Sequence, residues 1–134
     1  MIKKTTTIAL LIITSQLTLM SPAFAAKTLE ECQQVELSLS EASSCLDGVK
    51  KNIDRELQTW VNNHTFNLED KALVTGRYSA LKMFKRSQSN FITFRDNNCR
   101  WQYLAISPER GADIAYKNCY VRVTQTRIQE LSLV

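Results

Sequence analysis

The sequence predicts an all-α protein, a small antiparallel helical bundle or hairpin stapled by two disulfides. Only three glycines and two prolines occur in 134 residues, too few turn residues for a fold of many short strands. Apolar residues recur every three or four positions, which is the period of an amphipathic helix. Four cysteines behind a leader-like N-terminus indicate two disulfides, which small exported domains commonly use to support a limited core.

The N-terminal 25 residues have the pattern of a signal peptide. Lys3 and Lys4 form a positive start, residues 8–20 are mostly apolar, and an Ala-Phe-Ala sequence closes the segment at 23–25, as signal peptidase requires. The apolar run contains Thr, Ser and Gln and is shorter than the ~20 residues of a membrane span, so a retained anchor is the less favoured alternative. We predict cleavage after residue 25, a single domain over 26–134, and a periplasmic or secreted location.

The charge of the mature chain excludes some kinds of partner. Without Lys3 and Lys4, 15 basic side chains stand against 13 acidic ones, a net charge of +2. Both signs are interspersed along the chain, as on solvated helix faces. Such a balance gives no strong field for nucleic acid or anionic lipid. We therefore predict no nucleic-acid partner and no stable membrane anchor after signal cleavage.

Neither a metal site nor a catalytic site is expected. No CxxC or CxxH spacing occurs, and His64 is the only histidine, whereas zinc sites need several such ligands. No nucleophile motif lies near His64, and cysteines paired in disulfides lack the reactive thiolate. We predict that the protein is not an enzyme and carries no cofactor.

The cysteines allow three pairings. Cys32 and Cys45 are 13 positions apart, and Cys99 and Cys119 are 20 apart. Local closure costs less chain entropy, so we predict the bridges Cys32–Cys45 and Cys99–Cys119. The second bridge would clamp two helices across the Ser-Pro-Glu-Arg-Gly loop at 107–111.

Four helical segments are expected. A short piece lies between 28 and 44, and a helix capped by Ser43 or Ser44 follows it. The asparagine-rich residues 62–65 are interpreted as a loop. The last helix follows the loop at 107–111. The apolar face of the helix after Ser44 is formed by Leu46, Val49, Ile53, Leu57 and Trp60. The apolar face of the last helix is formed by Ile114, Val121, Thr124, Ile128 and Leu131.

A further apolar stripe begins at Leu68 and reaches Phe84, with Gly76 inside it. No proline or glycine interrupts the chain between residues 77 and 107, so this helix is expected to continue to Trp101. Its large aromatic residues have helical spacing, which is more typical of core than of a binding platform. We therefore predict that four aromatic side chains are core residues: Phe84, Phe91, Phe94 and Trp101.

Two segments carry the pattern of one protein family. Residues 88–99 contain a glutamine, two aromatic residues, an arginine, an aspartate and a cysteine at set intervals. Residues 119–131 contain a cysteine, a threonine, an arginine, a glutamate and a leucine. Together they resemble the LprI-type lysozyme inhibitors, small exported helical proteins of bacteria, over about residues 29–132. The matching residues are Gln88, Phe91, Phe94, Arg95, Asp96, Cys99, Cys119, Thr124, Arg127, Glu130 and Leu131.

The chain departs from the family pattern in its second helix. Where the family often has aspartate-x-x-leucine-asparagine, this chain has Asp54, Leu57 and Gln58, and Val61 stands where a tyrosine usually follows. The resemblance implies a protein-binding module that inhibits lysozyme. A net charge of +2 lacks the acidic field that would speed association with a cationic lysozyme. The alternative is therefore a non-enzymatic accessory or structural protein of the envelope that shares this scaffold.

Charged residues in the matching segments are the first site candidates. They flank the expected bridge between 99 and 119, where two helices approach closely, and arginine pairs with carboxylates through two parallel hydrogen bonds. We predict that they hold the helices in register, with Arg127 reaching Asp96 or Glu130; an exposed partner-binding patch is the alternative. This predicted structural charge network comprises Arg95, Asp96, Arg127 and Glu130.

A second set of candidates lies beside the loop at 107–111. A loop held by a disulfide is pre-organised, which lowers the entropy cost of binding a partner. Small inhibitors of enzymes present such loops to a cleft. We predict that the contact with a protein partner, which the resemblance implies to be lysozyme, is made by Tyr103, Leu104, Ile106, Glu109 and Arg110.

Overall fold

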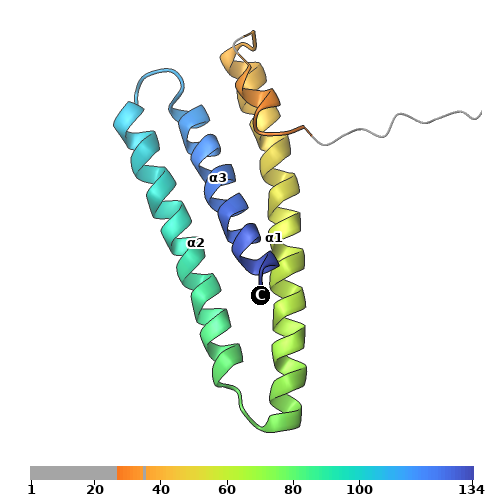
Figure 1. Ribbon diagram of the computed structural model, residues 1–134. Helices are drawn as coiled ribbons and strands as arrows, with labels where there is room; N and C mark the ends of the chain where they lie inside the picture. Colours follow the sequence, from red (N-terminus) through yellow and green to blue (C-terminus); the bar gives the residue numbers. More distant parts are fainter. Residues whose placement is uncertain (1–26, 35) are drawn as a thin grey trace, which may run out of the picture.

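The computed structural model describes residues 27–34 and 36–134, and the expected signal peptide lies outside these ranges. They form a short 3₁₀ turn, η1 (Glu31–Gln33), and three α-helices, α1 (Leu39–Thr75), α2 (Ser79–Ile106) and α3 (Ala112–Ser132), with no strand among the described residues. The all-α prediction is therefore confirmed. Successive helices run antiparallel, so α1 and α3 point the same way (Figure 1).

Helix α1 begins earlier than predicted. The hydroxyl of Ser38 accepts a hydrogen bond from the backbone N–H of Glu41, and the Glu41 carboxylate accepts one from the backbone N–H of Ser38 at 2.9 Å. This reciprocal pair is a capping box. The predicted cap at Ser43 or Ser44 was wrong. Glu41 closes the capping box at Ser38 upstream, and its side chain is longer than that of Asp47, which follows Ser44 by three residues.

The predicted loop at 62–65 was also wrong, because these residues continue α1. The side-chain amide of Gln58 donates to Asn62 Oδ1 at 2.8 Å, and that of Asn67 donates to Asn63 Oδ1 at 2.8 Å. Amide pairs four residues apart stabilise a helix surface. The asparagines are therefore solvated helix residues rather than turn residues.

Gly76 divides the predicted stripe of Leu68 to Phe84 between two helices. Its φ of 71° lies in the left-handed region, and its N–H donates to the carbonyl of Ala72, as in a glycine-terminated helix. The chain then reverses into α2. Helix α2 continues to Ile106 without interruption, as predicted.

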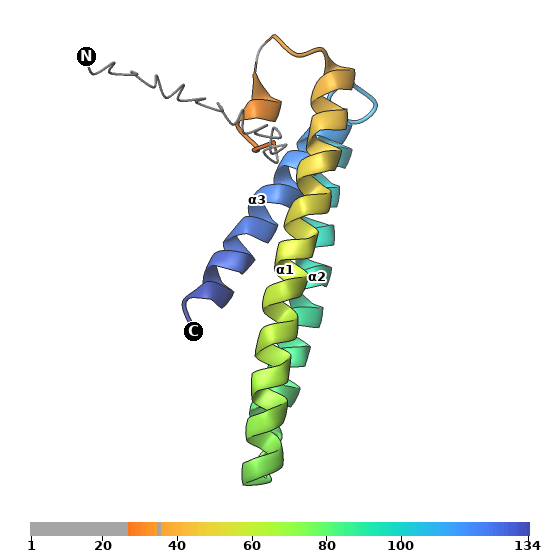
Figure 2. The same cartoon turned by 90° about the vertical axis from the view of Figure 1, so that its right-hand side faces the viewer.

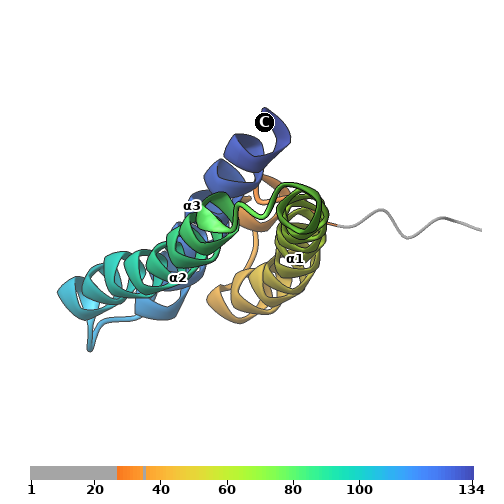
Figure 3. The same ribbon diagram turned by 90° about the horizontal axis from the view of Figure 1, so that it is seen from below.

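The hydrophobic core lies between α1 and α3, with α2 beside them. Viewed from below, the C-terminal end of α3 lies to one side of α1 and α2 (Figure 3). The apolar faces predicted for the helix after Ser44 and for the last helix are confirmed, with Trp60 and Ile114 half-buried at the margins. The buried side chains of these faces are Leu46, Val49, Ile53, Leu57, Val121, Thr124, Ile128 and Leu131.

The prediction for the aromatic residues of α2 was only partly right. Phe84 and Phe91 are half-buried against the core. Phe94 and Trp101 are 58% and 59% exposed, so their assignment to the core was wrong. The inward face of α2 follows Arg95 and Cys99, and no helix of the described chain covers the opposite face.

Both predicted disulfides form. Cys32–Cys45 ties η1 to the start of α1 with a Cα–Cα distance of 5.5 Å, and Cys99–Cys119 joins α2 to α3 at 5.4 Å. All four cysteines are buried. The local pairing favoured by loop entropy is therefore the observed one.

Helices α1 and α2 extend beyond the end of α3 as a two-helix arm (Figures 1 and 2). Ala72 and Leu81 are buried in this arm. At the end of α3, His64 Nε2 lies 2.8 Å from the carbonyl oxygen of Leu131 and so links α3 to the arm. None of the helices in the described residues has the length and apolar character needed to span a bilayer.

Candidate functional site

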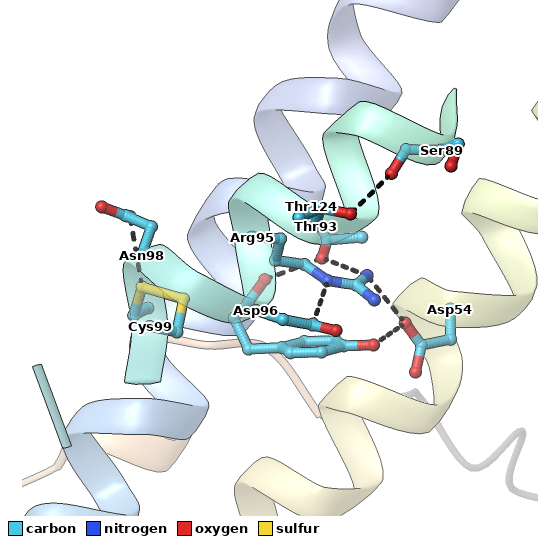
Figure 4. A network of polar contacts seen from close by, with 10 residues as sticks. Asp54, Ser89, Thr93, Arg95, Asp96, Asn98, Cys99 and Thr124 are labelled. Atoms are coloured by element: carbon cyan, nitrogen blue, oxygen red, sulfur yellow. Dashed lines mark hydrogen bonds and ion pairs between the residues drawn. A yellow bond between two sulfur atoms is a disulfide. The ribbon is translucent and has the colours of Figure 1, made fainter. Parts of the chain in front are cut away.

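A buried arginine on α2 connects all three helices. Arg95 is 6% exposed, and its Nη1 donates to Thr124 Oγ1 of α3 at 3.2 Å. The guanidinium group also forms ion pairs of 3.6 Å with Asp54 of α1 and with Asp96 on its own helix (Figure 4). Its Nε is buried without a hydrogen-bond partner among the described residues. Burial of this arginine therefore depends on neighbouring charges and on stacking.

The stacking partner is Tyr120 of α3. The Arg95 guanidinium carbon lies 3.8 Å from the centre of the Tyr120 ring, within the range of a cation–π contact. The Tyr120 hydroxyl donates to Asp54 Oδ1 at 2.9 Å. Burial, and then this hydrogen bond, raise the pKa of the Tyr120 phenol well above its usual value. The phenol therefore stays protonated and acts as a donor, not as a base.

The second predicted arginine also bridges two helices. Arg127 of α3 donates from Nε to Gln88 Oε1 at 3.3 Å and from Nη2 to Ser87 Oγ at 3.2 Å, both on α2. It also pairs with Glu130 Oε2 at 3.0 Å on its own helix. The structure shows no ion pair between Arg127 and Asp96 in the described ranges. Of the two partners predicted for Arg127, only Glu130 is observed.

The four predicted charges therefore lie in two groups rather than one. Phe91 lies between these groups, because the guanidinium carbons of Arg95 and Arg127 are 5.5 and 5.7 Å from its ring centre. The arrangement favours a role in holding α2 to α3. We propose this structural role for the four charged residues.

A lysine on α3 forms another interhelical contact. Lys117 Nζ lies 2.9 Å from carboxylate oxygens of both Asp47 on α1 and Asp113 on α3, and 2.7 Å from Ser43 Oγ. Burial alone would lower the pKa of Lys117, but the hydrogen bonds to the two carboxylates raise it above its usual value. Burial also opposes ionisation of Asp113, but hydrogen bonds from Ser43 and Lys117 lower its pKa overall.

These shifts predict how the melting temperature depends on pH. Because the pKa of Asp113 is lowered from 3.8, its charge stabilises the folded state above that value, and the stabilisation is lost as the pH falls through the lowered pKa. The raised pKa of Lys117 contributes stability below 10.5 that is lost as the pH rises through the folded-state value. Melting followed by circular dichroism should therefore show a plateau between about pH 5 and pH 10.

The matched variant for this prediction is Asp113→Asn, which keeps the shape of the side chain. It should melt lower than the wild type at neutral pH and lose less stability on acidification. An acid decline of unchanged steepness in Asp113→Asn would assign that decline to other carboxylates.

The predicted contact residues lie where α2 ends and α3 begins. Leu104, Glu109 and Arg110 are exposed, and Tyr103 and Ile106 are half-buried. Gly111, with a φ of 100°, starts α3 and is the residue for which this turn requires glycine. The Cys99–Cys119 disulfide joins α2 to α3 about two helical turns away from this turn on each side.

The sequence interpretation missed the partners of Arg95 outside its own helix. Asp54 was considered only as part of a family pattern, and Tyr120 was not singled out. Asp54 directly follows Ile53 and precedes Leu57 by about one turn, so it lies beside the buried face of α1, and an acidic residue beside such a face is a sign of a partner. Nothing in the local pattern around Tyr120 indicates its contact with α1.

Together these features define a small, disulfide-bonded helical module whose polar residues join helices. No set of three or more His, Cys, Asp or Glu side chains in the described part is placed to hold a metal ion. The family model described as "Lysozyme inhibitor LprI" matches residues 30–131, and the chain belongs to this family. The resemblance seen in the sequence is thereby confirmed. Membership of a family described as inhibitors is consistent with the prediction of a non-enzymatic protein. Comparisons with curated proteins and with solved structures found no match.

Proposed function

We propose that this protein is exported and, as a periplasmic or secreted module, binds and inhibits lysozyme. The match of residues 30–131 to the lysozyme inhibitor family carries this proposal. Two disulfides are consistent with export, because such bonds persist mainly in oxidising compartments. The mature domain would be residues 26–134, released by cleavage of the signal peptide after residue 25.

We assign the contact with lysozyme to the turn between α2 and α3. Its exposed residues project from an end of the bundle where the Cys99–Cys119 bridge limits movement, so little order has to be gained on binding. Lysozymes cleave their substrate with a pair of carboxyl groups in a cleft. The exposed guanidinium group of Arg110 is complementary to such carboxylates. We expect Arg110, with Leu104 as an apolar contact, to contribute most to binding.

A turbidity assay tests the proposed function. Lysis of bacterial cells by hen-type, goose-type and invertebrate-type lysozymes is followed with and without the mature protein. We expect micromolar protein to slow at least one of the three. No slowing of any of them would favour the alternative, an accessory protein of the envelope that shares the scaffold.

Two arginine variants distinguish contact residues from structural ones. Arg127→Ala removes hydrogen bonds to Gln88, Ser87 and Glu130, and should lower the stability by about 1–2 kcal/mol. Arg110→Ala lies in the exposed turn and should melt like the wild type but inhibit less. Calorimetric melting and one binding titration of each variant measure both effects. If Arg127→Ala melts like the wild type yet abolishes the complex, the assignments are reversed.

A further inference from the structure

The exposed face of α2 carries a shallow groove of about 510 Å³, which lies apart from the contacts that join the helices. No charged side chain lines this groove, although α2 carries five basic residues. The lining consists of two aromatic rings, three carboxamides and one hydroxyl group. These side chains belong to Asn90, Thr93, Phe94, Asn97, Asn98 and Trp101.

The two aromatic rings form a regular pair along the helix. Phe94 and Trp101 are seven residues apart, which places them about 10.5 Å apart along the helix axis and on nearly the same side. Each ring is more than half exposed. Exposed apolar groups that are gathered together mark binding surfaces more often than isolated ones do. The spacing is close to the length of two pyranose rings in an extended glycan chain.

The carboxamides offer unused hydrogen-bonding groups beside these rings. The side chains of Asn90 and Asn97 make no hydrogen bond within the part of the chain that the structure describes. Asn98 Oδ1 accepts a hydrogen bond from Trp101 Nε1 at 3.3 Å, which restrains the indole ring. An asparagine side chain has both donors and an acceptor. The groove can therefore pair with ligand groups of either kind.

We propose that this groove binds a neutral oligosaccharide whose sugar rings carry acetamido groups. The C–H face of a pyranose ring is apolar and stacks on an aromatic ring, while its hydroxyl and acetamido groups need the donors and acceptors that carboxamides supply. A charged ligand would find no opposite charge in the lining. Any ligand that covers the open amides of Asn90 and Asn97 must pair with them or leave them unpaired at a desolvation cost, and an acetamido group offers a carboxamide both an N–H donor and a carbonyl acceptor.

The test uses the mature protein and the β-1,4-linked tetramer of N-acetylglucosamine, with no lysozyme present. Titration calorimetry should detect saturable binding, and the tryptophan emission should shift to shorter wavelength as Trp101 is covered. Trp101→Ala and Asn97→Ala should each weaken binding, the former at least about tenfold. Phe66→Ala, an exposed aromatic residue on α1, is the matched control and should bind as the wild type does.

Three results would overturn the proposal. The first is no binding of the tetramer by the wild type. The second is equal binding by the wild type and Trp101→Ala, both shown to be folded by their melting curves. The third is that the wild type binds the glucose tetramer, which lacks acetamido groups, as tightly as the N-acetylglucosamine tetramer. A Trp101→Ala variant that inhibits lysozyme less, in a protein that binds no sugar, would instead make this face a protein contact. The titration contains no lysozyme, so its result tests sugar binding even if the protein does not inhibit lysozyme.

Discussion

Replacing Arg95 with alanine should lower the melting temperature by more than about 10 °C, which corresponds to ~3 kcal/mol in a domain of this size. The substitution removes a guanidinium group that is packed against Tyr120 and Phe91. It also removes the hydrogen bond to Thr124, whose buried hydroxyl then keeps only its bond to the Tyr120 carbonyl. The cavity and the lost contacts act together, so the effect should exceed that of Arg127→Ala.

Arg95→Met separates the contribution of packing from that of charge. Methionine fills much of the same space, and exchanging a buried ion pair for well-packed apolar residues is often close to neutral. The ion-pair distances of 3.6 Å to Asp54 and Asp96 are long, and both carboxylates are partly exposed. Water can therefore solvate these carboxylates when the arginine is gone. We expect Arg95→Met to retain at least half of the stability that Arg95→Ala loses.

Thermal melting followed by circular dichroism measures both variants, with Arg86→Ala as the control. Arg86 is an exposed arginine on the same helix. The Arg86→Ala variant should melt within about 2 °C of the wild type. If Arg95→Met is destabilised as strongly as Arg95→Ala, the charge itself stabilises the fold. If neither variant is destabilised, Arg95 does not hold the helices together, and the alternative of a partner-binding patch becomes the better one.

The parts of the fold that the sequence predicts are those set by local rules. Helical periodicity identifies the buried faces of α1 and α3, because burial repeats with the turn of the helix. Loop entropy identifies both disulfides, because each joins cysteines that are near in sequence. The turn between α2 and α3 is marked by its proline and glycine. All of these follow from neighbours within a few turns of the chain.

The failures concern interactions between distant segments or competition between similar local patterns. Ser38 and Ser44 each precede an acidic residue by three positions, and the longer side chain of Glu41 closes the box at Ser38. Trp101 has the same helical spacing as core residues, but its exposure depends on where α3 lies. The contact of Asp54 with Tyr120 joins residues 66 positions apart. No local pattern contains that information.

Removing the Cys99–Cys119 bridge by the double substitution Cys99→Ala and Cys119→Ala should cost about 3 kcal/mol, because the unfolded chain gains the freedom of a 20-residue loop. A further loss comes from packing, since both sulfur atoms are buried. The amides of Asn98 and Gln102, which lie 3.7 and 3.3 Å from Cys119 Sγ, also lose their acceptor. Alanine is preferred to serine because it adds no buried hydroxyl group. Denaturant titration under non-reducing conditions gives the free energy of unfolding.

The matched control is Cys32→Ala with Cys45→Ala, which opens a loop of 13 residues. Loop entropy alone makes this bridge weaker by only about 0.4 kcal/mol, so a much larger difference between the two double variants would come from packing between α2 and α3. The two bridges should differ more clearly in function. Only Cys99–Cys119 restrains the turn with Arg110, so its loss should weaken lysozyme inhibition even at temperatures where the variant is fully folded. Equal inhibition by the folded Cys99→Ala, Cys119→Ala variant and the wild type would contradict a pre-organised turn and would place the contact elsewhere on the bundle.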